Sequence, residues 1–306
     1  MMVDLLFRWT KKKAVSLAPR IDHGSQILFH LLYGVHNRLL AWQPGPVTMT
    51  VRGLPLQMPA DHLLPFYVGE HPLVDQPLAD LAENVAARDG HLHAIDVGAN
   101  IGDTAALMAA RVPSGTFLCV EGNDRYLPYL RTNLARLPSG VTTFLEPVLL
   151  GEKDELAAVS MSTQFGTGFL SASPGARTQL RSLDSVLEDP RYRDLPWNLV
   201  KLDTDGYDFD ILKGAQGLLR TRGPALFFEY VPQLLRDRGT EPMEVFTWLA
   251  ARGYAEFTMF TNFGEKLLTV DARSFDAVAQ LATYSSAFRR LHYDVLAVRP
   301  SHQGLV

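Results

Sequence analysis

The sequence has a single cysteine, no strong charge bias and no hydrophobic run long enough to cross a bilayer. Cys119 lies in the apolar run TFLCVE, so an intrachain disulfide is excluded, and we expect an inert core thiol in a reducing compartment. A net charge of −4 gives no chain-wide field that would attract polyanions, so we expect no nucleic-acid partner. No His/Cys cluster has zinc spacing, and we predict no metal.

Residues 1–45 are predicted to form an N-terminal helical extension. Residues 27–42 are strongly apolar, but they are fewer than the roughly 20 residues that span a bilayer, and they include His30, His36 and Arg38. We expect a helix that packs on a core or a partner. The alternative is that this helix and Lys11 to Lys13 hold the protein at a membrane surface. No secretory signal is recognisable at the start of the chain, which favours a cytoplasmic protein.

Pro44-Gly45-Pro46 predicts a linker, after which residues 46–306 are expected to form one α/β domain. A strand or hairpin is predicted over 47–57 and a helix over 78–88. Strand-like runs then alternate with helical stretches, which predicts a seven-stranded, mainly parallel sheet with helices on both faces. The runs cover 91–97, 116–120, 141–150, 199–202, 225–229, 257–260 and 293–298, and the helical stretches cover 104–111, 125–137, 209–220 and 243–252.

The first of these runs ends in a turn with two glycines and two acids. Gly98 and Gly102 allow close backbone approach, while Asp96 and Asp103 supply carboxylates. The dinucleotide pattern G-x-G-x-x-G and the P-loop are both missing, and the acids would repel a pyrophosphate. A cationic cofactor without phosphate suits these acids better, and S-adenosylmethionine carries both an ammonium and a sulfonium. The alternative is that the glycines only make a tight turn.

Two further strand ends carry acids. Glu121 closes the second run, 25 positions after Asp96, where a carboxylate can accept hydrogen bonds from both hydroxyls of a ribose. Asp203 and Asp205 follow the run over 199–202, and they could serve as a general base, as a magnesium or manganese site, or as loop-ordering groups. Asp208 is expected to cap the next helix. Glu229 is a candidate for acceptor binding or proton removal, or a structural acid.

Some side chains near these strand ends have simpler readings. Residues 161–173 are predicted to be a flexible loop, either a cover over the cofactor or an ordinary exposed loop. Tyr207 and Tyr230 could stack on adenine or a sugar, but packing is the expected role. His91 and His93 precede the first strand on its far side and are read as structural.

Several of these segments together resemble the FkbM family of S-adenosylmethionine-dependent methyltransferases. The resemblance covers about residues 75–235 and rests on Asp96–Asp103, Val120–Asn123, Leu183–Leu187, and Val200–Gly206 followed by Ile211–Ala215. It implies a class I, Rossmann-like fold and methyl transfer to an acceptor, typically a hydroxyl of a sugar or secondary metabolite. The partner is then a small molecule or a glycan.

The expected site follows from both the pattern and the resemblance. Many relatives have Asp-x-Glu-Gly where this chain has Asp203-Thr204-Asp205-Gly206, so the Asp205 carboxylate is set back by about one methylene. We expect catalytic roles for Asp203, Asp205 and Glu229, and cofactor binding by Asp96, Gly98, Asn100, Gly102, Asp103, Glu121 and Asn123.

Two other classes of function stay open at this point. An NAD(P)-dependent oxidoreductase would share the sheet and the acid at Glu121, but it needs room for a pyrophosphate. A non-catalytic module that binds S-adenosylmethionine would share the cofactor residues and lack turnover.

Overall fold

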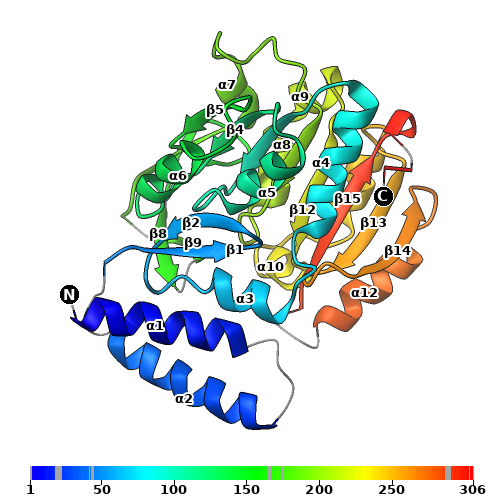
Figure 1. Ribbon diagram of the computed structural model, residues 1–306. Helices are drawn as coiled ribbons and strands as arrows, with labels where there is room; N and C mark the ends of the chain where they lie inside the picture. The colour runs from blue at the N-terminus through cyan, green and yellow to red at the C-terminus, as the bar shows by residue number, and fades with distance from the viewer. Residues whose placement is uncertain are drawn as a thin grey trace.

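The computed structural model describes residues 2–17, 23–40, 42, 45–164, 167–173, 175–286, 291–302 and 304–305. Its centre is a twisted, eight-stranded sheet with helices on both sides (Figure 1). The strands of this sheet are β3 (His93–Val97), β4 (Thr116–Val120), β5 (Thr142–Glu146), β11 (Leu199–Leu202), β12 (Ala225–Tyr230), β13 (Glu256–Thr261), β14 (Lys266–Asp271) and β15 (Tyr293–Val298). They lie in the order β14-β13-β15-β12-β11-β3-β4-β5.

The predicted α/β sheet is confirmed, with one more strand than the seven expected. Strands β5, β4, β3, β11 and β12 are parallel, whereas β15 runs antiparallel between β12 and β13. The eighth strand, β14, pairs antiparallel with β13 at the edge of the sheet. Its residues are exposed or half-buried, so it lacks the buried positions that mark the inner strands.

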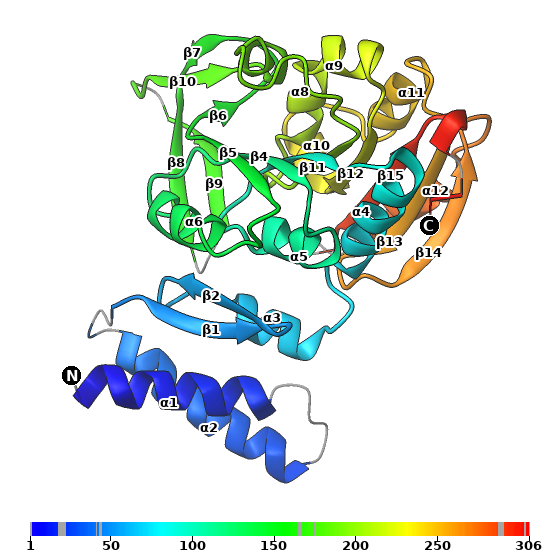
Figure 2. The same cartoon turned by 45° about the horizontal axis from the view of Figure 1, so that its top comes forward.

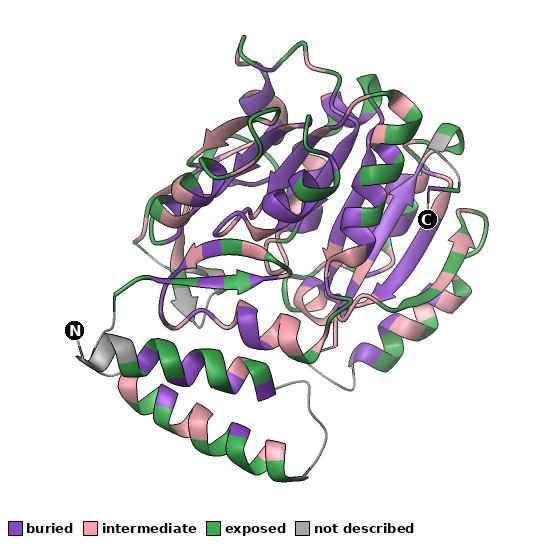
Figure 3. Cartoon of the chain, in the orientation of Figure 1, coloured by how far each residue is buried: buried purple, intermediate pink, exposed green. Residues whose placement is uncertain are grey.

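Alternating side chains along the strands separate two hydrophobic cores. Ala94, Phe117 and Leu199 face one side of the sheet, while Ile95 and Leu118 face the other. The first core is covered by α4 (Gln76–Asp89), α5 (Asp103–Arg111) and α6 (Leu127–Leu134). The second is covered by α7 (Leu183–Leu187), α8 (Asp208–Lys213), α9 (Gln216–Thr221), α10 (Pro232–Asp237), α11 (Glu244–Ala250) and α12 (Asp276–Ser286). Figure 3 shows the strands buried between these layers.

The front of the chain forms a separate layer below the sheet in Figure 2. It holds α1 (Met2–Leu17), α2 (His23–Leu40), the hairpin of β1 (Val47–Val51) and β2 (Leu54–Met58), and α3 (Leu64–Glu70). Phe7 of α1 shares a buried cluster with both hairpin strands and with Ile101. The predicted hairpin over 47–57 and the helix within 27–42 are therefore present. The domain boundary at residue 45 stays a prediction, and Gln43 and Pro44 lie outside the described residues.

None of the helices in the described part of the chain combines the length and the apolar character that a bilayer span requires.

Two predicted elements differ from the structure. Residues 161–173 are not a loop: β8 (Val159–Gln164) and β9 (Thr167–Ala172) form an antiparallel hairpin. The run 141–150 is divided between β5 and the short β6 (Leu149–Leu150), which joins β7 (Glu155–Ala157) and β10 (Thr178–Arg181) in a small sheet. A short 3₁₀ helix, η1 (Pro300–His302), follows the last strand.

The predicted helix 209–220 is broken into α8 and α9, and the carboxylate of Asp184 holds the second piece. At the break, a side chain on Gly214 would collide with the backbone of Gly151. The backbone N–H groups of Gly217 and Leu218 donate to Asp184 Oδ2 and Oδ1 at 2.6 and 2.9 Å. An acid at a helix start satisfies donors that have no partner within the helix. The Leu183–Leu187 motif thus fixes α9 from a distant part of the chain.

Replacing Asp184 with alanine should lower the free energy of unfolding by about 1–2 kcal/mol, because the first turn of α9 loses its acceptor. Urea denaturation followed by circular dichroism measures the change. Asp194→Ala is the control, since that side chain is 90% exposed and pairs only with a surface arginine. Equal losses in the two variants would contradict the capping role.

Candidate active site

Strands β4 and β5 lie on one side of β3 in the sheet, whereas β11 and β12 lie on its other side. Two adjoining cavities open at the carboxyl ends of the strands at this switch point, where such sheets bind ligands. A narrow cavity of about 80 Å³ lies over β3 and β4. A wider cavity of about 690 Å³ extends towards α3 and β12. The two share Gly98, Asn100, Asp203 and Asp205 in their walls, so they form one crevice with a narrow and a wide end.

The turn after β3 touches the turn after β11. Gly98 has φ +71°, and a Cβ on it would collide with the carbonyl oxygen of Asp203. Gly102 has φ +83°, and its Cβ would lie 2.8 Å from Leu130. Only glycine fits both demands at these positions. Gly98 therefore lines the crevice, whereas Gly102 permits the packing of α5 against α6 beneath it.

A buried ion pair lies directly below this turn. Asp96 and Lys201 are opposite each other in the pairing of β3 with β11, and Lys201 Nζ lies 3.1 Å from Asp96 Oδ1. Thr104 donates to the other Asp96 oxygen at 2.7 Å, and Lys201 donates to the carbonyl of Gly98 at 3.0 Å. Burial opposes the lysine charge, yet the neighbouring carboxylates raise the pKa of Lys201 above its usual value. Asp96 lines neither cavity; its side chain lies beneath the turn that follows β3.

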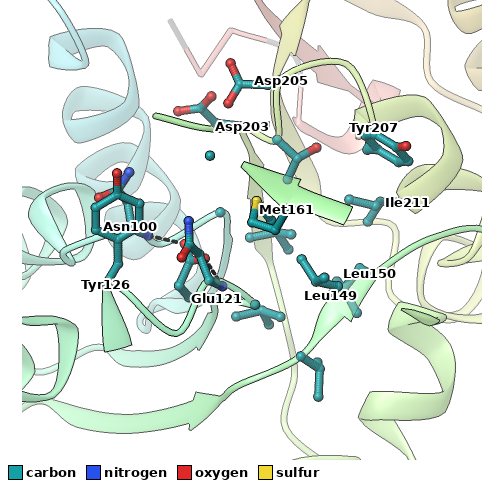
Figure 4. Close-up of a pocket in the computed structure, with 18 residues that line it drawn as sticks. Asn100, Glu121, Tyr126, Leu149, Leu150, Met161, Asp203, Asp205, Tyr207 and Ile211 are labelled. Atoms are coloured by element: carbon teal, nitrogen blue, oxygen red, sulfur yellow. Dashed lines mark hydrogen bonds between the residues drawn. The ribbon is translucent and has the colours of Figure 1, made fainter. Parts of the chain in front are cut away.

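Glu121 stands in the wall of the narrow cavity and orders the turns around it (Figure 4). Its Oε2 accepts from the backbone N–H of Asn100 at 2.8 Å, and its Oε1 accepts from that of Asn123 at 2.6 Å. Burial raises the pKa of this carboxyl. Each carboxylate oxygen can accept more than one hydrogen bond, so both keep acceptor capacity for a ligand.

The rest of the narrow cavity is apolar on one side and polar on the other. Figure 4 shows Leu149, Leu150 and Ile211 across the cavity from Asn100, with Asp203 and Asp205 together at one end. Neither lysine nor arginine lines this cavity among the described residues. The β8–β9 hairpin contributes Met161 and Gly168 to its wall. A flat apolar slot with a carboxylate at its edge can hold a nucleoside, and it offers nothing to neutralise a phosphate.

The three acids after β11 occupy different surroundings. Asp203 is half-exposed and lies 3.6 Å from Lys201 Nζ. Burial, with the charges of Asp203 and Asp208, raises the pKa of Asp205. Asp208 is the first residue of α8 and not its N-cap, and it accepts from Thr204 at 3.1 Å, so the predicted capping role is wrong.

Further acids gather at the wide end. Burial and the nearby charge of Asp75 raise the pKa of Asp103 to about 7. Asp75 itself pairs with Arg52 at 3.3 Å. Glu229, on β12, faces the wide cavity 3.4 Å from His292 Nε2, and burial raises its pKa well above the ordinary value. The wide end is thus an acidic chamber suited to cations and hydroxyls.

Several cavity residues escape prediction because they come from segments remote in the sequence. His62, Tyr67 and His71 line the wide end from the stretch around α3, and Phe263 stacks on His71 with ring centroids 3.8 Å apart. His62 Nε2 lies 3.2 Å from Asn100 Oδ1, and burial lowers the pKa of His62 to about 4, so its ring is neutral. No local motif marks these residues; only the fold brings them to the crevice.

Other predicted side chains lie elsewhere. Tyr207 lines the narrow cavity, but the guanidinium of Arg238 covers its ring at 3.7 Å. Tyr230 is buried in the core, and neither His91 nor His93 lines the crevice. Within the described ranges, no group of three or more His, Cys, Asp or Glu has the geometry to hold a metal ion.

The sheet order and the acid-lined crevice define a class I, Rossmann-like methyltransferase. Counted along the seven predicted strands, the order is 3-2-1-4-5-7-6 with the last strand reversed. Residues 96–255, about half of the sequence, match the methyltransferase FkbM domain. The chain belongs to this family of methyltransferases, as the motifs predict.

Solved structures of methyltransferases resemble the chain at low sequence identity. Methyltransferase FkbM from Methylobacillus flagellatus KT is 16% identical over 76% of this chain and 52% of its own, with a TM-score of 0.35. The Bacillus cereus O-methyltransferase in complex with SAH is 13% identical over 73% and 80%, with a TM-score of 0.41. A human methyltransferase 10 domain protein is 12% identical over 81% and 88%, with a TM-score of 0.43.

The chain spans about half the length of the Methylobacillus protein. No curated protein matches it.

Replacing Lys201 with methionine should cost about 3–5 kcal/mol of stability, because it leaves the Asp96 carboxylate buried without its cation. The double variant Asp96→Asn/Lys201→Met should recover part of this loss. Lys213→Met is the matched control: it breaks a half-buried ion pair with Asp210 on α8, and it should cost about 1 kcal/mol or less. Chemical denaturation distinguishes the three. A loss no larger at Lys201 than at Lys213 would refute the structural role of the pair.

The variant Asp103→Asn should become more stable relative to wild type as pH rises from about 4 to about 7, and the difference should level off above that. The folded-state pKa of Asp103 is raised to about 7, so the folded chain keeps this proton where the unfolded chain has lost it. Wild-type stability from this group is therefore present at low pH and lost as pH rises. Urea midpoints of both proteins across this range test the sign. A constant difference would contradict the shift.

Proposed function

We propose that this protein is an S-adenosylmethionine-dependent O-methyltransferase whose acceptor is a hydroxyl of a sugar, glycan or secondary metabolite. The observation that carries the cofactor assignment is the narrow cavity. It has the Glu121 carboxylate at its edge, an apolar wall at Leu149 and Leu150, and no cationic lining residue among those described. This lining fits a nucleoside joined to a cationic group, and it opposes the pyrophosphate of NAD(P).

The chain's own residues supply the binding of each part of this cofactor. Glu121 accepts from the ribose hydroxyls while its backbone partners hold it in place. Asn100, Asn123 and the close approach at Gly98 shape the same end. Asp103 lies at the wide end, where it attracts the ammonium of the amino-acid portion. Asp96 and Gly102 act from beneath the turn by keeping it in shape.

When bound, the sulfonium supplies a methyl group that is already activated for transfer. The protein then has to orient the acceptor oxygen and remove its proton. Asp205 is the base that we favour, because its carboxyl group lies where the two cavities meet. Burial and the charges of Asp203 and Asp208 raise its pKa to about 8, and a positive charge beside it favours the ionised form that a base requires. The carboxyl group of Asp203 lies 3.6 Å from Lys201 Nζ and lines the same crevice.

The wide cavity provides for the acceptor. Burial and the neighbouring carboxylates raise the pKa of Glu229, which favours the protonated carboxyl that can donate a hydrogen bond to an acceptor hydroxyl. The stacked rings of His71 and Phe263 offer an apolar face for a sugar or an aromatic acceptor. These features favour a neutral, hydroxyl-bearing molecule over an acidic one.

Asp205→Asn should lower kcat by roughly 10²–10⁴, the range for loss of a general base, with little change in cofactor affinity. Glu121→Ala should do the reverse: it should raise the cofactor Kd by at least about tenfold, since hydrogen bonds to a charged acceptor contribute roughly 1.5–3 kcal/mol. Calorimetry with S-adenosylmethionine gives the Kd. Turnover requires an acceptor, identified by transfer of a radiolabelled methyl group in cell extracts and mass spectrometry of the product.

Asp194→Asn, on the exposed surface, is the control for both measurements. Binding of NAD and not of S-adenosylmethionine would favour the oxidoreductase. Cofactor binding with no methyl transfer to any acceptor, and with biological activity unchanged in Asp205→Ala, would favour a non-catalytic module. If both site variants weaken only cofactor binding, the division of roles is wrong.

A further inference from the structure

Helix α2 is apolar on its outer face as well as on its inner face. Inward, Phe29 and His36 are buried, against α1 and α3. Outward, four aliphatic side chains are exposed, and Trp42 just beyond the helix is 71% exposed. At 3.6 residues per turn, the four aliphatic positions fall within an arc of about 100° on one face of α2. They are Ile27, Leu28, Leu31 and Val35.

The neighbouring helix adds aromatic and basic groups to this layer. Trp9 and Leu6 of α1 are exposed, as are Lys12 and Lys13. Figure 1 shows α1 and α2 side by side on the far side of the front layer from the central sheet. We call the exposed side chains of Leu6, Trp9, Lys12, Lys13, Ile27, Leu28, Leu31, Val35, Arg38 and Trp42 the outer patch.

The charge of this region is opposite to that of the rest of the protein. Residues 1–42 contain six Lys and Arg against two acidic residues, a formal net charge of +4, whereas the whole chain carries −4. One of the six, Lys11, is buried and does not reach the surface. Helix α2 contains no acidic residue, and Arg38 lies within its apolar arc. Tryptophan, aliphatic and basic side chains on one face are the composition of helices that lie in a membrane interface.

A second copy of the chain fits this surface less well. A two-fold dimer would place the outer patch against itself and bring Arg38, Lys12 and Lys13 of both copies into one interface, where the patch supplies no acid to neutralise them. Anionic headgroups instead neutralise these residues, and the interface region accepts the aliphatic and tryptophan side chains.

We propose that the outer patch is a docking surface for an anionic lipid membrane. The helices lie in the plane of the interface and do not cross it. Helix α1 packs on α3, whose residues Leu64 and Tyr67 line the wide cavity. Docking therefore places the wide cavity about two packed helices away from the lipid headgroups, since the axes of packed helices lie roughly 8–10 Å apart.

Flotation of the full-length protein with lipid vesicles tests this inference. We expect binding to phosphatidylcholine vesicles containing about a quarter phosphatidylglycerol to be at least roughly tenfold tighter than to phosphatidylcholine alone, because several basic residues contribute. Leu31→Glu should weaken it by about tenfold or more. Leu156→Glu is the matched control, since Leu31 and Leu156 are 64% and 62% exposed, and it should bind as wild type does.

Thermal melting must show that Leu31→Glu is folded as wild type is; Leu28→Ser serves as a milder variant if it is not. Failure of the wild type to prefer anionic vesicles overturns the proposal, as does an equal loss in the two glutamate variants. A dimer in sedimentation that Leu31→Glu converts to a monomer, without vesicle binding, would assign the patch to a second copy. None of these outcomes depends on methyl transfer, so the proposed activity is tested separately.

Discussion

The buried pair between Asp96 and Lys201 is the interaction on which the crevice depends. Both residues lie in central strands, in register with each other, at the position just before each strand turns into a loop. Lys201 also donates to the carbonyl of Gly98, so it connects the turn after β3 to the neighbouring strand β11. Two charges removed from water are stable only when each satisfies the other. The pair therefore fixes where the turns after β3 and β11 meet.

The same lysine balances an unusual concentration of acids. Asp103, Asp205, Asp208 and Glu229 gather near the crevice, and the pKa of each of these four carboxyl groups is raised. In each of the four, burial is the largest cause and neighbouring negative charge adds to it. A positive charge near these groups would offset the repulsion between them. The acidity of the crevice thus favours a positively charged ligand over an anion.

Local signals in the sequence predict seven of the eight strands of the central sheet, and they place Glu121, Asp203 and Asp205 at strand ends that line the crevice. Buried parallel strands are continuous apolar runs, and Glu121, Asp203 and Asp205 follow them directly. Sequence order cannot show that His62 reaches Asn100, because that contact depends on how α3 packs beside the sheet. Sequence order also does not show that Asp96 differs from the acids that line the crevice, because the register of β3 with β11 is what places its side chain beside Lys201. The β8–β9 hairpin was missed because small hydroxylated residues are as common in loops as in exposed strands.

The backbone conformation of the turn after β11 suits a short acid at position 205. Among the described residues, four other than glycine have positive φ, and three of them, Asp75, Asn100 and Asp205, line the crevice. Aspartate and asparagine tolerate this left-handed region better than longer side chains do, because their short polar groups can bond locally. At φ 52°, Asp205 meets the demand of its turn with less strain than glutamate would. The turn that brings the end of β11 against Gly98 therefore holds Asp205 in a conformation that its short side chain tolerates, and the same turn places its carboxyl group in the crevice.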